Sequence, residues 1–298
     1  MRLDDLPQSD RIEDRRGGLS SFPGGRGGLG IGTVVVLGLI GWALGIDPSV
    51  LIGGAEMMSR SGQSGQESKA GSTSSGTPSD ALGKFVSAIL GSTEAEWTDI
   101  FAEAGRKYEP PTLVMFSGAT QSGCGLAQSA MGPFYCPIDQ KVYLDTSFFQ
   151  DLERRFRACD AGSKTCQFSQ AYVIAHEIGH HVQNLMGLLP QVQQAQRGMD
   201  KVEANSLQVR VELQADCLAG VWGNRGQAKW NFIEPGDVES ALQTASAIGD
   251  DRLQRRSQGY VVPDAFTHGS SEQRTRWFMA GLKGGTVSSC NTFRAEQL

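Results

Sequence analysis

The sequence has few of the features that nucleic-acid-binding proteins need. Its 298 residues contain no cluster of lysine and arginine, and no aromatic stripe interleaved with basic residues. The 27 basic and 32 acidic residues give a formal net charge of −5 at pH 7. A mildly acidic chain without a basic patch lacks the charge that grips phosphates, so we expect no nucleic acid among its partners.

Histidine is scarce, and cysteine lacks the spacing of a zinc cluster. There are four histidines and six cysteines, and no Cys-x-x-Cys pair occurs. A cysteine-based zinc cluster is therefore not favoured. Three of the four histidines, at positions 176, 180 and 181, fall within one short stretch. This concentration makes that stretch the first candidate for chemistry.

Residues 170–185 have apolar side chains at helical spacing, which predicts a core-packed helix. On this helix His176 and His180 lie one turn apart on one face, the geometry needed to bind one metal ion through two imidazoles. Glu177 can reach a water on that metal and is predicted as the general base. A His-Glu-x-x-His string also occurs by chance, but Gly179 is costly inside a helix and indicates that something approaches closely. His181, rotated off this face, is not expected to bind metal.

A catalytic zinc site takes three protein ligands and leaves a fourth position for water, so a third ligand is needed. Residues 209–222 also have apolar residues at helical spacing, with Glu212 and Asp216 one turn apart. We predict Glu212 as the third ligand. Asp216 would accept the free ring N–H of a ligand histidine, in the first place His176. The alternative is a surface glutamate and an aspartate that only packs helices together.

Three segments of distinct composition precede the globular part. Residues 1–28 are polar and of mixed charge, and we expect a disordered cytoplasmic segment. Residues 29–51 begin with an uncharged apolar run and are predicted as a transmembrane anchor, with a cleaved signal peptide as the alternative. Residues 52–79, rich in serine and glycine, read as a flexible linker. Because arginines flank only the N-terminal side of the run, we expect a single-pass protein whose catalytic domain is extracytoplasmic, either periplasmic or extracellular.

Residues 80–298 suit one catalytic domain of the α+β class, mainly α with a small β-sheet. Helices are expected at 81–90, 94–105, 148–158 and 237–248, and strands at 112–116 and 141–145. Ser270 and Gln273 form a capping box that opens a last helix.

The six cysteines permit disulfides if the domain lies outside the cytoplasm. We prefer the pairs Cys124–Cys136 and Cys159–Cys166 because each closes a short local loop. Cys217–Cys290 would tie the C-terminal tail to the Glu212 helix. Other connectivities exist. Reduced, buried cysteines in a cytosolic enzyme are the alternative.

The motifs HEIGH at 176–180 and ELQAD at 212–216 resemble those of the gluzincin metallopeptidases, in which a second helix supplies Glu-x-x-x-Asp. More closely, the chain resembles the putative neutral zinc metallopeptidase family of bacterial membrane proteins. That resemblance includes RRG at 15–17, the glycine-rich run before the apolar segment, and HGSSEQR at 268–274. It implies a zincin-like catalytic domain. In such a domain a strand, here assigned to residues 142–144, would lie along the rim of the cleft, where an extended peptide could add through main-chain bonds.

The same resemblance implies roles for two residues near the C-terminus. In related metallopeptidases a histidine outside the zinc helix donates to the developing oxyanion, which His268 would do here. Arg274, six residues later, would steady Asp216 or a substrate carboxylate. For His268 the alternative is a loop residue in solvent.

The sequence thus predicts a membrane-anchored zinc endopeptidase with a protein or peptide substrate. One Zn²⁺, bound by the two histidines and Glu212, would lower the pKa of its water to roughly 7 while Glu177 takes the proton. Two other classes stay open. One is a zinc-binding envelope scaffold that cleaves nothing, and the other is a zinc amidase acting on cell-wall peptides.

Overall fold

The computed structural model describes residues 1–17, 74–76, 78–154, 159 and 164–298. The anchor expected at 29–51 and nearly all of the linker expected at 52–79 lie outside these residues. Within the described ranges, no helix is long and apolar enough to cross a membrane.

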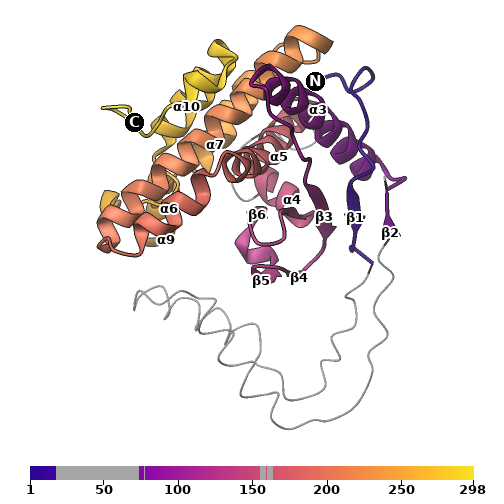
Figure 1. The fold of residues 1–298 in the computed structure, drawn as a ribbon. Helices are drawn as coiled ribbons and strands as arrows, with labels where there is room; N and C mark the ends of the chain where they lie inside the picture. The colour runs from indigo at the N-terminus through magenta and orange to yellow at the C-terminus, as the bar shows by residue number, and fades with distance from the viewer. Residues whose placement is uncertain (18–73, 77, 155–158, 160–163) are drawn as a thin grey trace, which may run out of the picture. The chain divides into compact units, whose positions relative to one another are not determined.

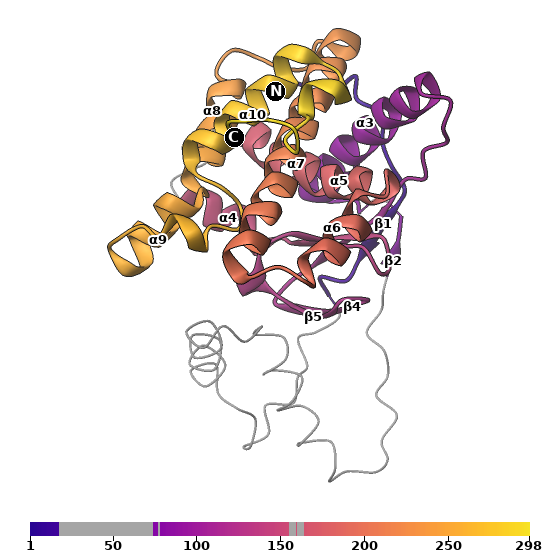
Figure 2. The same ribbon diagram turned by 60° about the vertical axis from the view of Figure 1, so that its left-hand side comes forward.

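Long helices dominate the domain, as the sequence predicts (Figure 1). Helices α5 (Lys164–Leu185) and α7 (Lys201–Trp230) pack against each other, and α10 (Ser271–Gly284) runs along α7. Gly220 of α7 and Gly281 of α10 face each other's helix so closely that an added Cβ would overlap the opposing backbone. The shorter helices are α4 (Ser147–Arg154), α6 (Leu188–Gln196), α8 (Asp237–Ala247) and α9 (Asp250–Gln258), of which α8 and α9 lie beside α10 (Figure 2).

Helix α3 (Ala81–Glu103) replaces the two helices expected at 81–90 and 94–105. The Gly91-Ser92-Thr93 sequence predicts a break, but the two hydroxyl groups turn back to the carbonyls of the preceding turn. Gly91 is needed for another reason: a Cβ there would overlap the backbone of Pro7. The helix therefore continues past a glycine that serves packing against the N-terminal segment.

A five-stranded sheet has the order β2-β1-β3-β7-β6. Its central strand β3 (Thr112–Phe116) is parallel to both neighbours, and its last four residues are fully buried, as a strand covered on both faces requires. The other strands are β1 (Ile12–Asp14), β2 (Ser74–Ser75), β6 (Phe134–Cys136) and β7 (Lys141–Asp145), and β4 (Ala119–Ser122) with β5 (Gly125–Gln128) forms a separate hairpin.

Residues 142–144, expected to form an open edge strand, lie inside the sheet. β7 pairs with β3 on one side and β6 on the other, so the assignment of residues 142–144 to an open edge is wrong. The edge of the sheet beyond β7 is β6, which packs against α5. Sequence spacing locates a strand but not its place in the sheet, because pairing joins distant segments.

Residues 1–16 contradict the expected disordered segment. Met1, Leu6 and Ile12 are buried, and β1 pairs with β3 inside the sheet. The α-ammonium of Met1 lies 2.9 Å from the buried carboxylate of Asp237. Three widely spaced apolar residues show no periodicity, so the polar composition of residues 1–28 does not reveal them.

The three predicted disulfides are confirmed, as Cys124–Cys136, Cys159–Cys166 and Cys217–Cys290. The third joins α7 to the segment that follows α10. No free cysteine is left in the described part of the chain.

Residues 1–16 and 74–298 form one compact unit. Segments of one folded unit lie on the same side of any membrane. We therefore expect residues 1–16 and the domain to share one compartment, which differs from the predicted cytoplasmic N-terminus with an extracytoplasmic domain.

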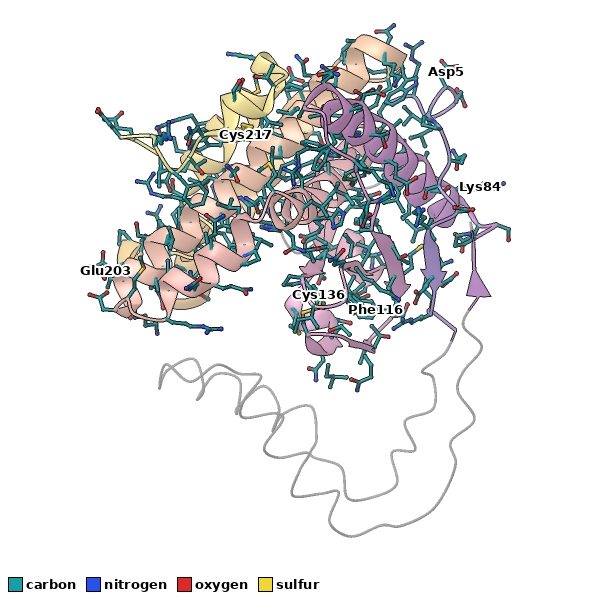
Figure 3. The ribbon with its side chains drawn as sticks, viewed as in Figure 1. Asp5, Lys84, Phe116, Cys136, Glu203 and Cys217 are labelled. Atoms are coloured by element: carbon teal, nitrogen blue, oxygen red, sulfur yellow. A yellow bond between two sulfur atoms is a disulfide. The ribbon has the colours of Figure 1, made fainter. Side chains whose placement is uncertain are left out.

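We expect cysteines introduced at Asp5 and at Glu203 to react with a membrane-impermeant maleimide from the same side. Both side chains are exposed, the first in the N-terminal segment and the second on α7 (Figure 3). Labelling is compared between intact and lysed cells, with the unaltered chain as the control because its cysteines are paired. Labelling of one position and not the other in intact cells would contradict the packing of the N-terminal segment.

Candidate metal centre

Helices α5 and α7 bring together the three side chains that the sequence predicts as ligands. The Nε2 atoms of His176 and His180 lie 3.3 and 3.4 Å from Oε2 of Glu212. Potential ligand atoms of all three residues lie within 4.8 Å of one another. The helices can approach closely here because residue 179 is a glycine. A Cβ at this position would lie 3.0 Å from the carbonyl oxygen of Ala215. The close approach of α7 explains why a glycine, which destabilises a helix interior, occurs at position 179.

Asp216 contacts the ring of His176. Its carboxylate is completely buried and lies 2.8 Å from Nδ1 of His176. It also accepts hydrogen bonds from the hydroxyl of Tyr172 at 2.5 Å and from the Arg274 guanidinium at 2.9 Å. Burial alone would raise the pKa of Asp216, but Arg274 and His176 hold it well below its ordinary value. Ionised Asp216 accepts a hydrogen bond from the Nδ1–H of His176, and Nε2 faces Glu212.

The charges around the cluster suit a divalent cation. Burial disfavours a charged His176, but Asp216 and Glu212 outweigh it and raise the pKa of this imidazole to about 10. Glu212 itself is buried, and the two histidines hold its pKa well below the ordinary value. A buried carboxylate that faces two imidazole nitrogens attracts positive charge, and two imidazoles with one carboxylate are a donor set of catalytic zinc.

Two glutamines near the ligands escaped the sequence prediction. Gln183 places its Oε1 2.9 Å from Nδ1 of His180, and Gln208 donates to Oε1 of Glu212 at 2.9 Å. Each lies three or four residues from the ligand that it contacts, on the same face of its helix. Spacing alone could therefore have identified both residues.

A cavity of about 730 Å³ opens beside the cluster. Glu177, buried on α5, lines it together with the three candidate ligands. Strand β6, the loop before it and helices α4 and α6 contribute apolar and aromatic side chains to the cavity wall. The wall includes Met131, Pro133, Phe134, Tyr135, Phe148, Leu189 and Val192.

His268 also lines this cavity, from the loop between α9 and α10. Its side chain is half-exposed, and its Nδ1 lies 3.4 Å from the Asp250 carboxylate. Asp250 is itself fixed, because its other oxygen accepts the backbone N–H groups of Thr267, His268 and Gly269. The ring is thus neither a ligand of the cluster nor a free loop residue in solvent.

Arg274 and His181 are both committed to internal contacts. Arg274 is nearly completely buried and pairs with Asp216, which is one of the two roles that the sequence allows. The ring nitrogens of His181 lie 3.1 Å from the Tyr135 hydroxyl and 2.7 Å from the carbonyl oxygen of Glu109. Burial lowers the pKa of His181 to about 4, so this imidazole is neutral and ties α5 to β6.

Comparisons with known proteins agree with this geometry. A family model described as "Putative neutral zinc metallopeptidase" matches residues 1–293. The uncharacterized protein YpfJ of Escherichia coli (strain K12) is 45% identical over 303 residues, covering 98% of this chain and 99% of that protein. The uncharacterized protein Rv2575 of Mycobacterium tuberculosis (strain ATCC 25618 / H37Rv) is 41% identical over 222 residues, covering 72% and 71%. No solved structure shows a significant match. By sequence, the chain belongs to the putative neutral zinc metallopeptidase family.

Proposed function

We propose that this protein is a zinc-dependent endopeptidase that hydrolyses peptide bonds within protein or peptide chains. The observation that carries the proposal is the convergence of His176, His180 and Glu212 at the wall of a cavity that Glu177 also lines. Membership of a metallopeptidase family supports the reaction class. The cavity favours an enzyme over a scaffold, which would need no space for a substrate.

The proposed chemistry divides between the metal and the chain. His176, His180 and Glu212 would hold zinc, which would supply a Lewis acid for a water molecule and for the carbonyl under attack. Glu177 accepts a proton from the attacking water and passes it to the leaving amine. Asp216 and Gln183 hold the Nδ1 atoms of the two histidines, which keeps their Nε2 atoms toward Glu212. The buried surroundings strengthen each of these charge interactions.

His268 is proposed to stabilise the oxyanion that forms at the carbonyl. Desolvation opposes charge on His268, but Asp250 beside Nδ1 raises the pKa of this imidazole, and in the protonated ring Nε2 can donate to a bound substrate. Asp250 would act through His268 as a positioning residue. The edge strand β6, whose Phe134 and Tyr135 line the cavity, is proposed to bind the extended substrate in place of β7.

Charge in the cavity favours cleavage inside a chain. Of the described residues that line it, Arg274 is the sole lysine or arginine, and Asp216 already binds its guanidinium. A carboxypeptidase needs a cation for the substrate's terminal carboxylate. An endopeptidase has no such need.

The compartment is also part of the proposal. Three disulfides favour an oxidising environment outside the cytoplasm. The uncharged apolar run at 29–46 supports attachment to a membrane but not a single crossing, because residues 1–16 and 74–298 on its two flanks belong to one folded unit. Residues 1–16 would then lie on the same side as the domain, since they are part of it.

The purified full-length chain, loaded with zinc, is expected to cleave denatured casein into internal peptides. A zinc chelator should abolish the cleavage and added zinc should restore it. Mass spectrometry of the products identifies the bonds cut. A zinc-loaded chain that leaves a library of denatured proteins intact would contradict the endopeptidase, and cleavage of cell-wall peptides alone would identify the amidase instead.

A further inference from the structure

The candidate ligand His180 is linked by side-chain amides to the C-terminal segment. Its Nδ1 lies 2.9 Å from Oε1 of Gln183. The Nε2 of Gln183 donates to the carbonyl of Val211 at 2.8 Å and to Oε1 of Gln214 at 3.0 Å. The Nε2 of Gln214 then donates to the carbonyl of Cys290 at 3.0 Å. Five residues from three parts of the polypeptide are thus connected.

The hydrogen bonds of this series all run in the same direction, from His180 to Cys290. Each glutamine accepts through its oxygen and donates through its nitrogen, so the first donor is the ring N–H of His180 and the last acceptor is a backbone carbonyl. Both glutamine side chains are buried. Loss of Gln183 would remove the donor to the buried Gln214 oxygen, whereas loss of Gln214 would leave the Gln183 nitrogen with the carbonyl of Val211 as its acceptor.

The last acceptor is held by a covalent bond. Cys290 is completely buried and forms the disulfide with Cys217, three residues after Gln214 on α7 (Figure 3). Two residues beyond Cys290, the hydroxyl of Thr292 donates to the carbonyl of Arg210 at 2.7 Å. The segment from Cys290 to Thr292 therefore lies along the part of α7 that carries Glu212.

The two candidate histidine ligands are supported differently. His176 is oriented by Asp216, a carboxylate that Arg274 of α10 neutralises. His180 is oriented by a neutral amide whose own position depends on Gln214 and Cys290. Loss of the Cys217–Cys290 disulfide would therefore act on the His180 side of the site.

We propose that Gln183 and Gln214 are positioning residues for His180. We further propose that the Cys217–Cys290 disulfide fixes the carbonyl of Cys290, at which this series of hydrogen bonds ends, and so increases zinc affinity. The inference rests on the proposed function only in taking His180 as a zinc ligand. It adds a distant covalent bond to the determinants of metal binding.

The test measures the zinc dissociation constant of the full chain by competition with a chromophoric chelator. Gln183→Met is expected to raise the constant by about 10-fold to 100-fold, the usual effect of losing a partner of a ligand histidine. Gln214→Met and Cys217→Ser/Cys290→Ser should each raise it by about 10-fold, at the lower end of that range. The double variant Gln183→Met/Gln214→Met should have the same zinc dissociation constant as Gln183→Met alone, because residues that act through one series of hydrogen bonds do not have additive effects.

Matched controls separate positioning from general destabilisation. Gln194→Met changes an exposed glutamine on α6, and Cys124→Ser/Cys136→Ser removes a disulfide between β6 and the β4–β5 turn. Neither should change the zinc constant. Lowered melting temperatures with an unchanged zinc constant in the test variants would overturn the inference, as would equal changes in both disulfide variants. Should the Cys217→Ser/Cys290→Ser protein not fold, Gln214→Met, which keeps the disulfide, decides.

Zinc binding by the unaltered chain is measured first. Its absence would overturn the proposed function and this inference together. Normal binding with no cleavage of any protein would remove the endopeptidase alone, since the dissociation constants do not depend on turnover.

Discussion

Replacing Glu177 with glutamine is expected to leave zinc binding intact and to lower peptide cleavage on the order of 100-fold to 10,000-fold. Glutamine has the size of glutamate but cannot accept a proton. Glu177 lines the cavity beside His176, while the cluster of candidate ligand atoms consists of His176, His180 and Glu212. The substitution therefore removes the proposed base without touching a ligand.

Metal analysis and casein cleavage are measured on the same preparation of Glu177→Gln. His180→Ala is the matched comparison, because it removes a candidate ligand from the same helix and should lose both zinc and turnover. Undiminished turnover in Glu177→Gln would end the general-base assignment. Loss of zinc in this variant would instead make Glu177 part of the metal site.

The candidate site was predictable because most of it is local. His176 and His180 lie one turn apart on one helix, and Glu212 and Asp216 repeat that spacing on another. The two short disulfide loops follow from chain proximity in the same way. Only the contact between the two helices is long-range. It was predictable because a catalytic zinc site needs a third protein ligand.

What escaped prediction depends on contacts between distant segments. Gln214 reaches Cys290, 76 residues away, and no local pattern indicates that bond. The placement of β7 inside the sheet depends on its pairing with β3 and β6. Buried Ile12 belongs to a strand of three residues that is stable only because β3 and β2 flank it.

Arg274→Met is expected to lower the free energy of unfolding by about 3–5 kcal/mol, because it removes the permanent cation of the buried Asp216 carboxylate and leaves only His176, which loses its charge above a pKa of about 10. The hydroxyl of Tyr172 and the ring of His176 still contact that carboxylate, but neither has the fixed charge of a guanidinium. The loss should depend on pH. In the unaltered protein the folded-state pKa of Asp216 is lowered, so its stabilisation is present above the unfolded pKa and is lost as pH falls through the folded one. Without Arg274 this stabilisation is smaller, and the difference between the two proteins should shrink in acid.

Urea unfolding near neutral pH and in acid, with zinc chelated in both proteins, measures this difference without the contribution of metal binding. Arg276→Met is the control, since Arg276 lies on the same helix but pairs with Glu272 at an exposed site. Such a surface pair is worth no more than about 1 kcal/mol. Equal losses in the two variants would show that Arg274 acts as an ordinary helix residue. A loss confined to Arg274→Met near neutral pH would show that the buried Asp216–Arg274 pair, which contacts His176, stabilises the fold.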